Sequence, residues 1–561
     1  MTDPEASGRH ADDRVVSRGA GPAAPAELPC LGIDLGTTFS AVAVLGPDGA
    51  PLVIPNREGA RTTPSVVWFD GRQAWVGQKA ELRKDHSPQH IFEFVKRSMG
   101  RPVEIPESLA DDPDAVLPPL APYAVAGFKY GAAGISALIL RRLKKDAIRY
   151  FRREGLIAGA VDEEALGLDA VITVPAYFGD VERQQTRMAG YAAGLQVRAI
   201  LNEPTAAALT YGMAQRDPRR LLVFDLGGGT FDVTILETGR DGSATVIATE
   251  GDHNLGGYNI DEIVAEYLLD RYEAATGASV PEEHMVEVWT AARDAKIALS
   301  DRDEAFVELA FDPGELQITL HRARPDAGVG MADYEMDDGD AFYLEDRIAE
   351  LLQRCRTAAE RALDEAASHP SRGGRPLAWG DIDEVILAGG SCRIPVVRRR
   401  LAEWTGRPVR RTDQFDLDTA VAIGAALYGT HQERVSDVLA QSVGVEVEED
   451  GRRRIDRVLE ANAPLPASGQ RTYEAPANAM VVVREGDAEH ADEAVERGRL
   501  HLGNPQTAVT VTLRADADGI LTALAAWDGS SREVPIRNEL FDFDDRAVRL
   551  REKVAAVQIK S

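Results

Sequence analysis

The sequence predicts an α/β protein with two related lobes, followed by an all-β module, and three observations support this prediction. Residues 32–45 (GIDLGTTFSAVAVL) and 224–236 (FDLGGGTFDVTIL) share one pattern, in which an apolar strand runs into Asp-Leu-Gly, turns on small residues and resumes as an alternating strand. Between them, helical patterns such as residues 134–153 alternate with strand patterns such as 170–178, as in an α/β fold. From about residue 442 to 537, short β-rich runs separated by turn residues replace the helical periodicity.

The two hairpins indicate the lobes. Asp34 and Asp225 hold equivalent places in them and are 191 residues apart (225 − 34 = 191), whereas the period of a solenoid is about 20–50 residues. An interval of this size favours two related lobes. Alternation along the second hairpin is expected to place Phe231, Val233 and Ile235 on one side and Thr230, Asp232 and Thr234 on the other.

Two later segments complete the predicted elements. In residues 384–396 (EVILAGGSCRIPV), a buried strand ends in Gly389-Gly390 and a helix begins near Ile394-Pro395, since proline suits the first turn of a helix. Residues 541–561, after the all-β module, are expected to form one helix of about five turns at 3.6 residues per turn.

Length and charge exclude several classes of protein. A chain of 561 residues exceeds the roughly 250–300 residues that one core supports, so we expect at least two domains. Acidic residues outnumber basic ones by 91 to 63, and the resulting net charge of −28 argues against a nucleic-acid partner. Three widely spaced cysteines fit reduced thiols. Residues 1–27 resemble a disordered tail without an apolar targeting segment, and no run approaches the ~20 apolar residues of a membrane span, so we expect a cytoplasmic protein.

The glycine-rich hairpins suggest a phosphate site. The sequence has no G-x-x-x-x-G-K-[ST] motif, so it does not contain a P-loop. Glycines let the main chain approach phosphate oxygens, and successive N–H groups in a tight turn bind anions. An aspartate at the end of the preceding strand is suited to hold Mg²⁺ through water. One such hairpin is equally well explained as a tight turn, but two matching hairpins in two lobes favour the phosphate site.

The order of motifs extends this interpretation to a family. The chain resembles the seventy-kilodalton heat-shock chaperones (DnaK-like), whose ATPase domain has the actin-like (ribonuclease-H-like) fold. The matching segments follow the family's order over nearly the whole of the first 430 residues: GIDLGTTFS at 32–40, IPNREGARTTPSVVWF at 54–69, FVKRSMGR at 94–101, ITVPAYF at 172–178, LNEPTAAALTYG at 201–212, VFDLGGGTFDVTIL at 223–236, GDHNLGGYNID at 251–261 and AGGSCRIP at 388–395. ITVPAYF and LNEPTAAALTYG are particular to this chaperone group, whereas actins and sugar kinases share only the hairpins.

The resemblance implies roles for individual residues. Lys96 resembles the family's catalytic lysine beside the γ-phosphate, and in a loose phosphoryl-transfer transition state such positioned charge supplies most of the catalysis. Alone, a lysine is far more often a solvated surface residue. The implied catalytic set is Lys96, Glu203, Asp225, Thr230 and Asp34, and the implied ligands of Mg²⁺ and of the attacking water are Asp34, Asp225 and Glu203. The implied phosphate contacts are Gly36, Thr37, Thr38, Phe39, Gly227, Gly228, Gly229, Gly256 and Gly257.

The adenosine side follows from helical spacing and from the same resemblance. Arg293, Lys296 and Ser300 lie three and four residues apart, so a helix presents them on one face; an ordinary amphipathic surface helix has the same spacing. The resemblance adds Gly389, Gly390, Ser391, Cys392, Arg393 and Asp418. Two residues depart from the family: Arg293 stands where glutamate is common, and Cys392 where threonine is usual. We expect Cys392 to be an inert small residue, since a reactive thiol needs exposure and a lowered pKa.

The all-β module resembles the family's peptide-binding sandwich, with three departures. The linker, usually a leucine run closed by aspartate, is only Val438-Leu439-Ala440-Gln441. Arg452-Arg453-Arg454 replaces a glycine-rich segment near the peptide arch and either favours acidic peptides or forms a solvated turn. The helical lid is expected to be absent, which implies fast peptide release. The expected domains are a disordered tail (1–27), an ATPase domain (28–434), a linker (435–441), a β-sandwich (442–537) and a C-terminal helix remnant (538–561).

The resemblance therefore implies an ATP-dependent chaperone that couples ATP hydrolysis to the binding of unfolded or extended polypeptide. The implied cofactors are ATP, ADP, Mg²⁺ and K⁺, and the implied partners are a J-domain co-chaperone and a nucleotide exchange factor. Arg183 matches an arginine that couples the two domains in relatives. A nucleotide-gated regulatory protein with little ATP turnover is the alternative. A small-molecule kinase on the same fold is disfavoured by the LNEPTAAALTYG motif and by the all-β module.

Overall fold

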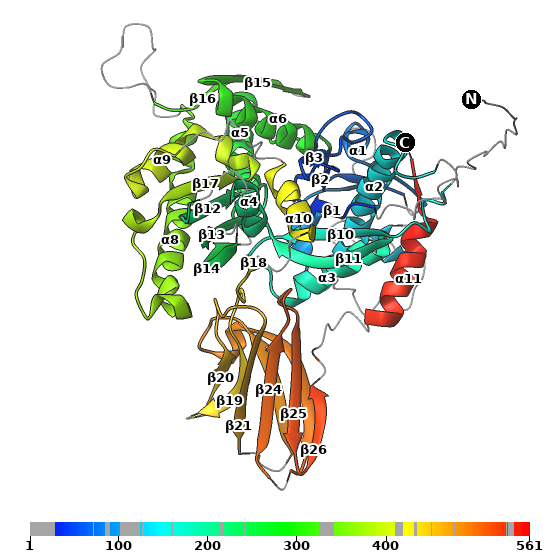
Figure 1. Ribbon diagram of the computed structural model, residues 1–561. Coiled ribbons are helices and arrows are strands. Elements are labelled where there is room, and N and C mark those ends of the chain that lie inside the picture. Colours follow the sequence, from blue (N-terminus) through cyan, green and yellow to red (C-terminus); the bar gives the residue numbers. More distant parts are fainter. Residues whose placement is uncertain are drawn as a thin grey trace, which may run out of the picture.

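The protein is described by a computed structural model, in which most of the chain forms a mixed α/β body with an attached β-sandwich (Figure 1). The described residues are 28–70, 72–84, 90–100, 124–125, 128–129, 131–158, 161–212, 217–240, 243–252, 254–312, 314–324, 341–409, 419–430, 435–449, 451–474, 478–505, 507–534, 536 and 543–560. The expected tail, residues 1–27, and the expected site residue Asp418 lie outside them.

The first unit of the α/β body is built on a mixed sheet of order β11-β10-β1-β2-β3, with β4 paired to β2. β1 runs parallel to β10 and antiparallel to β2, so its carboxyl end leads directly into a hairpin. The strands are β1 (Leu31–Asp34), β2 (Phe39–Leu45), β3 (Pro51–Val53), β4 (Thr63–Pro64), β10 (Leu168–Val174) and β11 (Leu195–Asn202). The helices that pack on this unit are α1 (Gln78–Glu81), α2 (Ala132–Arg153) and α3 (Asp180–Ala192). A second, small sheet has the order β27-β6-β5-β7 and consists of β5 (Val67–Phe69), β6 (Gln73–Val76), β7 (Ile91–Phe92) and β27 (Gln558–Ile559).

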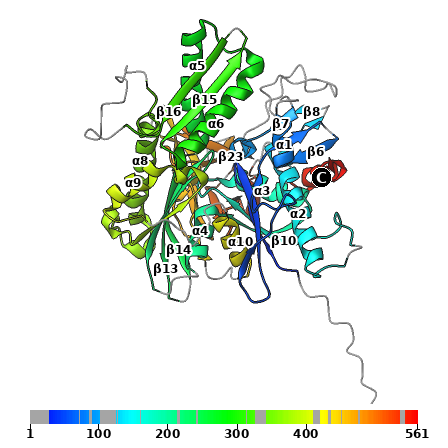
Figure 2. The same ribbon diagram turned by 90° about the horizontal axis from the view of Figure 1, so that it is seen from above.

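The second unit has a sheet of order β17-β12-β13-β14-β18, and Figure 2 shows it beside the first unit. Its strands are β12 (Arg220–Leu226), β13 (Phe231–Thr238), β14 (Ala244–Asp252), β17 (Glu384–Ala388) and β18 (Val435–Ser436). Its other elements are α5 (Gly257–Thr276), α6 (Met285–Asp301), β15 (Glu304–Phe311), β16 (Gly314–His321), α7 (Leu344–Arg347), α8 (Ala349–Glu365) and α9 (Pro395–Thr405). Phe231, Val233 and Ile235 are fully buried in one core on one side of β13, as the alternation predicts. Pro395 opens α9, where the sequence places the start of a helix.

Two helices rich in small residues join the units. α4 (Glu203–Gly212) and α10 (Ala420–Thr430) pack against each other, and their core contains residues from both sheets. The approach is close because glycine allows it: a Cβ at Gly424 would lie 1.8 Å from the main-chain oxygen of Ala206, and one at Gly32 would lie 2.1 Å from the nitrogen of Ala426. The sheets are therefore held at a fixed distance behind the two hairpins.

The all-β module is a sandwich of two four-stranded sheets, of orders β20-β19-β22-β23 and β21-β24-β25-β26. Its strands are β19 (Val443–Glu449), β20 (Arg452–Leu459), β21 (Ala467–Tyr473), β22 (Ala479–Glu485), β23 (Val495–Gly503), β24 (Val509–Ala515), β25 (Leu521–Trp527) and β26 (Ser530–Val534). Alternate side chains of both sheets fill one core; Val445 and Val483 come from one sheet and Val511 and Ala525 from the other.

The C-terminal segment differs from its prediction. A helix, α11, covers only Phe543–Ala556, and the chain then forms the short strand β27, parallel to β6 of the first unit. One continuous helix was therefore the wrong expectation. Buried Val557 ends the helix, and the free edge of β6 offers main-chain partners that a helix would not use.

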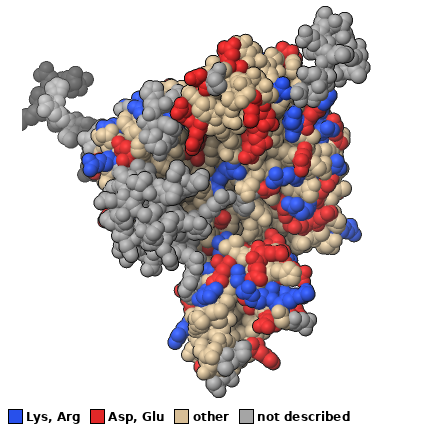
Figure 3. Space-filling model, turned by 180° about the vertical axis from the view of Figure 1, so that it is seen from behind, with Lys and Arg blue, Asp and Glu red and all other residues tan. Residues whose placement is uncertain are grey.

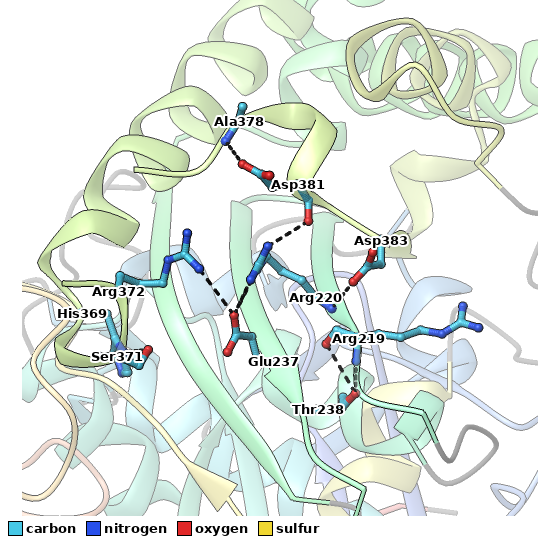
Figure 4. Close-up of polar contacts among 10 residues, drawn as sticks. All are labelled: Arg219, Arg220, Glu237, Thr238, His369, Ser371, Arg372, Ala378, Asp381 and Asp383. Atoms are coloured by element: carbon cyan, nitrogen blue, oxygen red, sulfur yellow. Dashed lines mark hydrogen bonds and ion pairs between the residues drawn. The ribbon is translucent and has the colours of Figure 1, made fainter. Parts of the chain in front are cut away.

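Figure 4 shows how the far end of the second sheet is fixed. The Arg220 guanidinium donates to Glu237 on the neighbouring strand (2.8 Å) and to the main-chain oxygen of Asp381 (3.1 Å), while the Arg220 main-chain N–H donates to Asp383 (2.8 Å). Arg372 lies 4.0 Å from the same Glu237 carboxylate. Because the charges of this cluster pair with one another, we interpret its role as structural.

Charge on the surface is mixed. On the face drawn in Figure 3, the Lys and Arg side chains of the described residues are interspersed with Asp and Glu, without a broad basic area. No helix in the described ranges combines the length and the apolar character needed to span a membrane.

Candidate functional site

The two Asp-Leu-Gly hairpins meet face to face. A Cβ at Gly228 would lie 1.9 Å from the Thr38 hydroxyl oxygen, and one at Gly229 would lie 2.9 Å from the Thr37 methyl group. Asp34 ends β1 and Asp225 lies one residue before the end of β12, so both carboxylates stand where their strands enter the turns. The structure thus brings together residues that are about 190 positions apart in the sequence, at one point between the units.

Lys96 lies at the same point. It belongs to a short 3-10 turn, Val95–Ser98, that follows Phe94 in the left-handed conformation (φ 55°). Its side chain is only 5% exposed, and its ammonium forms an ion pair with Glu203, the first residue of α4. The ring of Phe178 lies 6.0 Å from the Lys96 ammonium. A lysine buried against a carboxylate is not the solvated surface lysine that is the commoner alternative.

Four carboxylates surround this lysine. Burial raises the pKa of Asp225 well above its usual value, and Glu203, Asp232 and Asp34 add repulsion. Burial, followed by repulsion from Glu203, raises the pKa of Asp232 to about 7. The sequence analysis left Asp232 out of the site, although its alternation with Thr230 was a usable signal. Asp34 accepts a hydrogen bond from the Thr173 hydroxyl (3.4 Å).

The negative charge of these carboxylates favours the binding of a cation. Excess negative charge in a buried place favours a positive ion, and carboxylate oxygens with retained water are what Mg²⁺ takes. No group of three or more His, Cys, Asp or Glu side chains in the described part of the chain has the arrangement of a directly coordinated metal site. The sequence analysis expects Asp34, Asp225 and Glu203 to hold Mg²⁺ through water. Carboxylates that bind the ion through water lie farther apart than those of a directly coordinated site.

The remaining glycine turns converge on the hairpin of the second unit. The main-chain N–H groups of Gly257 and Tyr258, at the start of α5, donate to the carbonyls of Gly227 (2.9 Å) and Gly228 (2.7 Å). The Ser391 hydroxyl donates to the same Gly227 carbonyl (2.9 Å). A Cβ at Gly256 would lie 2.6 Å from the nitrogen of Gly229, so only glycine fits there. Gly389 has a φ of 78° and lies against Asp225.

The helix expected to line adenosine is α6, and its three residues have different partners. The Lys296 ammonium donates to the Gly257 carbonyl (3.0 Å) and pairs with Asp261 (2.6 Å), which ties α6 to the start of α5. The Ser300 hydroxyl donates to the Lys296 carbonyl of its own helix (3.1 Å). Arg293 lies 4.0 Å from Glu81 on α1, so the residue that departs from the family forms an ion pair between the two units.

The other expected nucleotide contacts vary in exposure. Gly36 and Thr38 are partly buried and Thr37 is buried in the first hairpin, whereas Phe39 is 49% exposed. Gly390 and Arg393 are exposed. Cys392 is buried, its thiol donates to the Phe224 carbonyl (3.5 Å), and burial raises its pKa, all of which favour an inert thiol. Arg97, which the sequence analysis did not select, lies 4.6 Å from the Tyr258 ring and joins the two units beside Lys96.

A second region of interest joins the α/β body to the sandwich. Asp437 is buried in the linker, where its carboxylate accepts hydrogen bonds from Asn202 (2.8 Å) and Thr205 (3.3 Å). Arg183 on α3 donates to the Asn202 side-chain oxygen (2.6 Å) and to the main-chain oxygen of Asp518 in the sandwich (3.2 Å). The sequence analysis sought the linker aspartate after Val438 and missed Asp437, directly before it.

Of the three arginines near the expected peptide arch, Arg453 and Arg454 are paired with carboxylates of the sandwich. Arg453 lies against Glu446 and Asp492, and Arg454 lies 3.4 Å from both Glu449 and Glu489. Since these guanidinium charges already face carboxylates of the same chain, the contacts do not favour a site for acidic peptides. The expected turn was wrong, because Arg452, Arg453 and Arg454 begin strand β20 and pair with β19.

Comparison with known proteins identifies a family and similar proteins. A family model described as "Hsp70 protein" matches residues 30–545. The chain is also 34% identical over 538 residues to a protein named "Chaperone protein DnaK" from Prochlorococcus marinus (strain MIT 9515), and the match covers 90% of this chain and 77% of that protein.

Proposed function

The chain belongs to the Hsp70 family and is an ATP-dependent molecular chaperone that hydrolyses ATP, and we propose that hydrolysis takes place where Lys96 meets the two Asp-Leu-Gly hairpins. The family match covers both the α/β body and the sandwich. The observation that carries the proposed site is the buried ion pair between Lys96 and Glu203, whose charges both act on Asp225. Its residues come from four separate stretches of the chain.

In the proposed reaction, Lys96 supplies a fixed positive charge. Phosphoryl transfer spreads negative charge over the phosphate oxygens in its transition state, and an ammonium held in a buried place stabilises that charge without reorganising. Glu203 holds the ammonium in place and accepts a hydrogen bond from the attacking water. Thr38 and Thr230 donate hydroxyl hydrogen bonds to phosphate oxygens. The N–H groups of Gly228 and Gly229 lie in the turn that faces Thr38.

Cations belong to the proposal. Asp34, Asp225 and Glu203 would hold Mg²⁺ through its water shell, and the raised pKa of Asp225 supports this because a cation relieves the repulsion that raises it. Bound Mg²⁺ would neutralise charge on the outer phosphates of ATP. K⁺ is proposed at the same carboxylate-lined place. Adenosine would lie between α6, with Arg293, Lys296 and Ser300, and the turn of Gly389 to Arg393, with Asp418 on the chain beyond.

We make a corresponding proposal for the architecture of the ATPase. The first and second units would be the two lobes of an actin-like ATPase, and α4 and α10 between them would be the hinge region. The proposed domain limits are 28–434 for the ATPase, 435–441 for the linker and 442–537 for the sandwich, and the start of β19 at Val443 supports the last of them. A cytoplasmic location is supported by three thiols that are free in the described chain.

The sandwich is proposed to bind unfolded or extended polypeptide, as its family membership implies. Such a ligand would add main-chain hydrogen bonds at a sheet edge and place alternate side chains in pockets. A J-domain protein and a nucleotide exchange factor are the proposed partners. The contacts of Asp437 and Arg183 supply a physical connection between the nucleotide site and the sandwich, since Asn202 and Glu203 are consecutive residues.

Single-turnover ATP hydrolysis with Mg²⁺ and K⁺ tests the proposal. Lys96→Ala is expected to lower the rate by about 100-fold or more, the usual effect of removing one transition-state donor. Lys84→Ala is the matched control, because Lys84 is also a buried lysine paired with a glutamate, Glu93, and it is expected to stay near the wild-type rate. Unfolded polypeptide should raise the wild-type rate. Tight ATP binding by wild type without hydrolysis would contradict the proposed site.

A further inference from the structure

The C-terminal segment returns to the first unit instead of remaining on the sandwich, as Figure 1 shows for α11 and the chain end. We name residues 543–560 the C-terminal clasp. Its strand β27 extends the sheet of β6, with Gln558 N–H donating to the Arg72 carbonyl (2.9 Å) and Lys560 N–H donating to the Ala74 carbonyl (2.8 Å). Main-chain pairing of this kind depends little on side chains and fixes the direction of the segment.

Arg141 on α2 fixes the end of the clasp helix. Its guanidinium donates to the main-chain carbonyls of Val554 (2.6 Å), Val557 (2.6 Å) and Ala555 (3.1 Å), and it also pairs with Glu164 (2.6 Å). The last carbonyls of a helix have no partners within it, and a cation there also interacts favourably with the helix dipole. Arg141 is only 4% exposed, so its charge has no second role at the surface.

Apolar contacts complete the attachment. Val554 is fully buried and Val557 is 3% exposed, and both belong to the core of the first unit. Leu550 packs against the same core, and the Arg551 guanidinium lies 5.1 Å from the centre of the Tyr191 ring on α3. Hydrogen bonds, a buried cation and core side chains therefore all hold the clasp to α2, α3 and β6.

The attachment gives the sandwich two connections to the α/β body. Its entrance is held by the linker, where β18 pairs with β14 and Asp437 is buried. Its exit continues from Ile536 to the clasp at Phe543 through six residues (543 − 536 − 1 = 6). Seven Cα–Cα steps span at most about 25 Å, whatever path they take. The exit of the sandwich therefore stays within that distance of Phe543, the first residue of α11, as long as the clasp is bound.

We infer that the C-terminal clasp is an intramolecular latch that keeps the sandwich close to the ATPase units when the linker is released. The inference rests on the proposed function in one respect, namely that the sandwich leaves its docked position during the ATP cycle. Among the described residues, no contact joins the clasp to the proposed nucleotide residues, so we expect it to limit domain separation without taking part in hydrolysis.

Hydrogen exchange on the intact wild-type protein tests whether the clasp is bound. The Gln558 and Lys560 amides are expected to exchange at least about 100-fold more slowly than in an unstructured peptide, with ADP as with ATP. Exchange at the unstructured rate in otherwise native protein overturns the inference. This readout needs no hydrolysis, so it stays informative if the proposed nucleotide site fails.

Small-angle scattering tests the consequence. With ADP, wild type is expected to keep nearly the radius of gyration that it has with ATP, whereas a chain truncated after residue 542 and the Arg141→Met variant expand. Arg149→Met, on the same helix, is the matched control and should behave as wild type, since the polar contacts of Arg149 in the described part of the chain are with Asp146 and Pro55. Equal expansion of wild type and truncated chain with ADP overturns the inference. A wild-type dimer that becomes a monomer on truncation also overturns it, since the clasp would then bind a second copy.

Discussion

The Arg183 guanidinium donates a hydrogen bond of 3.2 Å to the main-chain oxygen of Asp518, which connects helix α3 to the turn before β25 of the sandwich. The same side chain donates to Asn202, the residue before Glu203 at the Lys96 ion pair. Arg183 is fully buried among Asp437, Glu485, Glu182 and Asp180, and this burial lowers its pKa while the carboxylates raise it. Movement of the sandwich would therefore remove Asp518 and Glu485 from the surroundings of a buried cation that is bonded to the neighbour of Glu203.

Arg183→Ala is predicted to keep basal ATP hydrolysis and to lose its stimulation by unfolded polypeptide. In the proposed mechanism, basal turnover depends on the nucleotide site and not on Arg183. Stimulation depends on a change in the sandwich that is transmitted through Arg183 to Asn202. Single-turnover rates with and without polypeptide measure both properties. Arg198→Ala, an exposed arginine of β11 paired with Asp169, is the control and should keep its stimulation. Equal stimulation in Arg183→Ala and wild type would refute this role.

Local patterns were sufficient to predict much of the nucleotide region. The glycines of both hairpins, the turn before Pro395 and the alternation at Phe231 and Val233 depend on neighbours along the chain, so the sequence alone indicates them. Asp232 was overlooked for a different reason. Its place on the strand was predicted, but its relation to Glu203 arises only when α4 packs beneath the hairpin.

Contacts between distant segments could not be predicted in the same way. The hydrogen bonds from Arg141 to Val554 and Val557 join residues more than 400 positions apart. Neither segment has a sequence pattern that indicates the other as its partner. The C-terminal residues have helical periodicity, which favoured one helix. The free edge of β6 supplies the competing partner and turns the last residues into a strand. Asp437 was missed because a single aspartate in a linker has no periodic signal.

A pair of carboxylates marks the contact between the second unit and the sandwich. Glu365 at the end of α8 accepts a hydrogen bond from Asn462 (2.6 Å). It lies beside Glu250 of β14, whose carboxylate forms an ion pair with Arg361 (2.9 Å). Burial, with repulsion from Glu250 and from Asp487 of the sandwich, raises the pKa of Glu365 to about 7 from its usual value near 4.5. Between these two pH values the folded protein keeps a proton that the unfolded chain has lost, so stability falls as pH rises from about 4.5 to about 7.

Glu365→Gln is predicted to remove this part of the pH dependence, because the amide stays neutral at every pH. The variant should gain stability relative to wild type between pH 5 and pH 8, by about 1–2 kcal/mol after allowing for the partial exposure of Glu365. Thermal unfolding of both proteins at the two pH values measures the difference, and Asp180 and the other titrating groups cancel in it. Glu360→Gln, an exposed residue of the same helix, is the control. A pH-independent difference would contradict the assignment.

Lys144 is the clearest buried charge without a compensating bond. It is 2% exposed, and its ammonium has no hydrogen-bond partner within the described part of the chain. Burial lowers its pKa to about 8; the carboxylate of Glu164 opposes the shift, and the cations Arg551, Arg141 and Lys145 add to it. Below pH 8 the folded protein bears the full cost of a buried ammonium. Stability from this residue therefore rises with pH from about 8 to about 10.5, where the unfolded chain alone still holds the proton.

Lys144→Met is accordingly predicted to stabilise the protein at pH 7, by about 1–3 kcal/mol, because methionine fills a similar volume and needs no hydrogen bond. The gain should shrink as pH rises above 8, since wild-type Lys144 then becomes neutral in the folded state. Thermal unfolding at pH 7 and pH 9.5 measures both effects. Lys145→Met, the neighbouring lysine paired with Glu164 at 3.4 Å, is the control and should not gain stability. A lower unfolding temperature for Lys144→Met at pH 7 would mean that the ammonium has a stabilising partner after all.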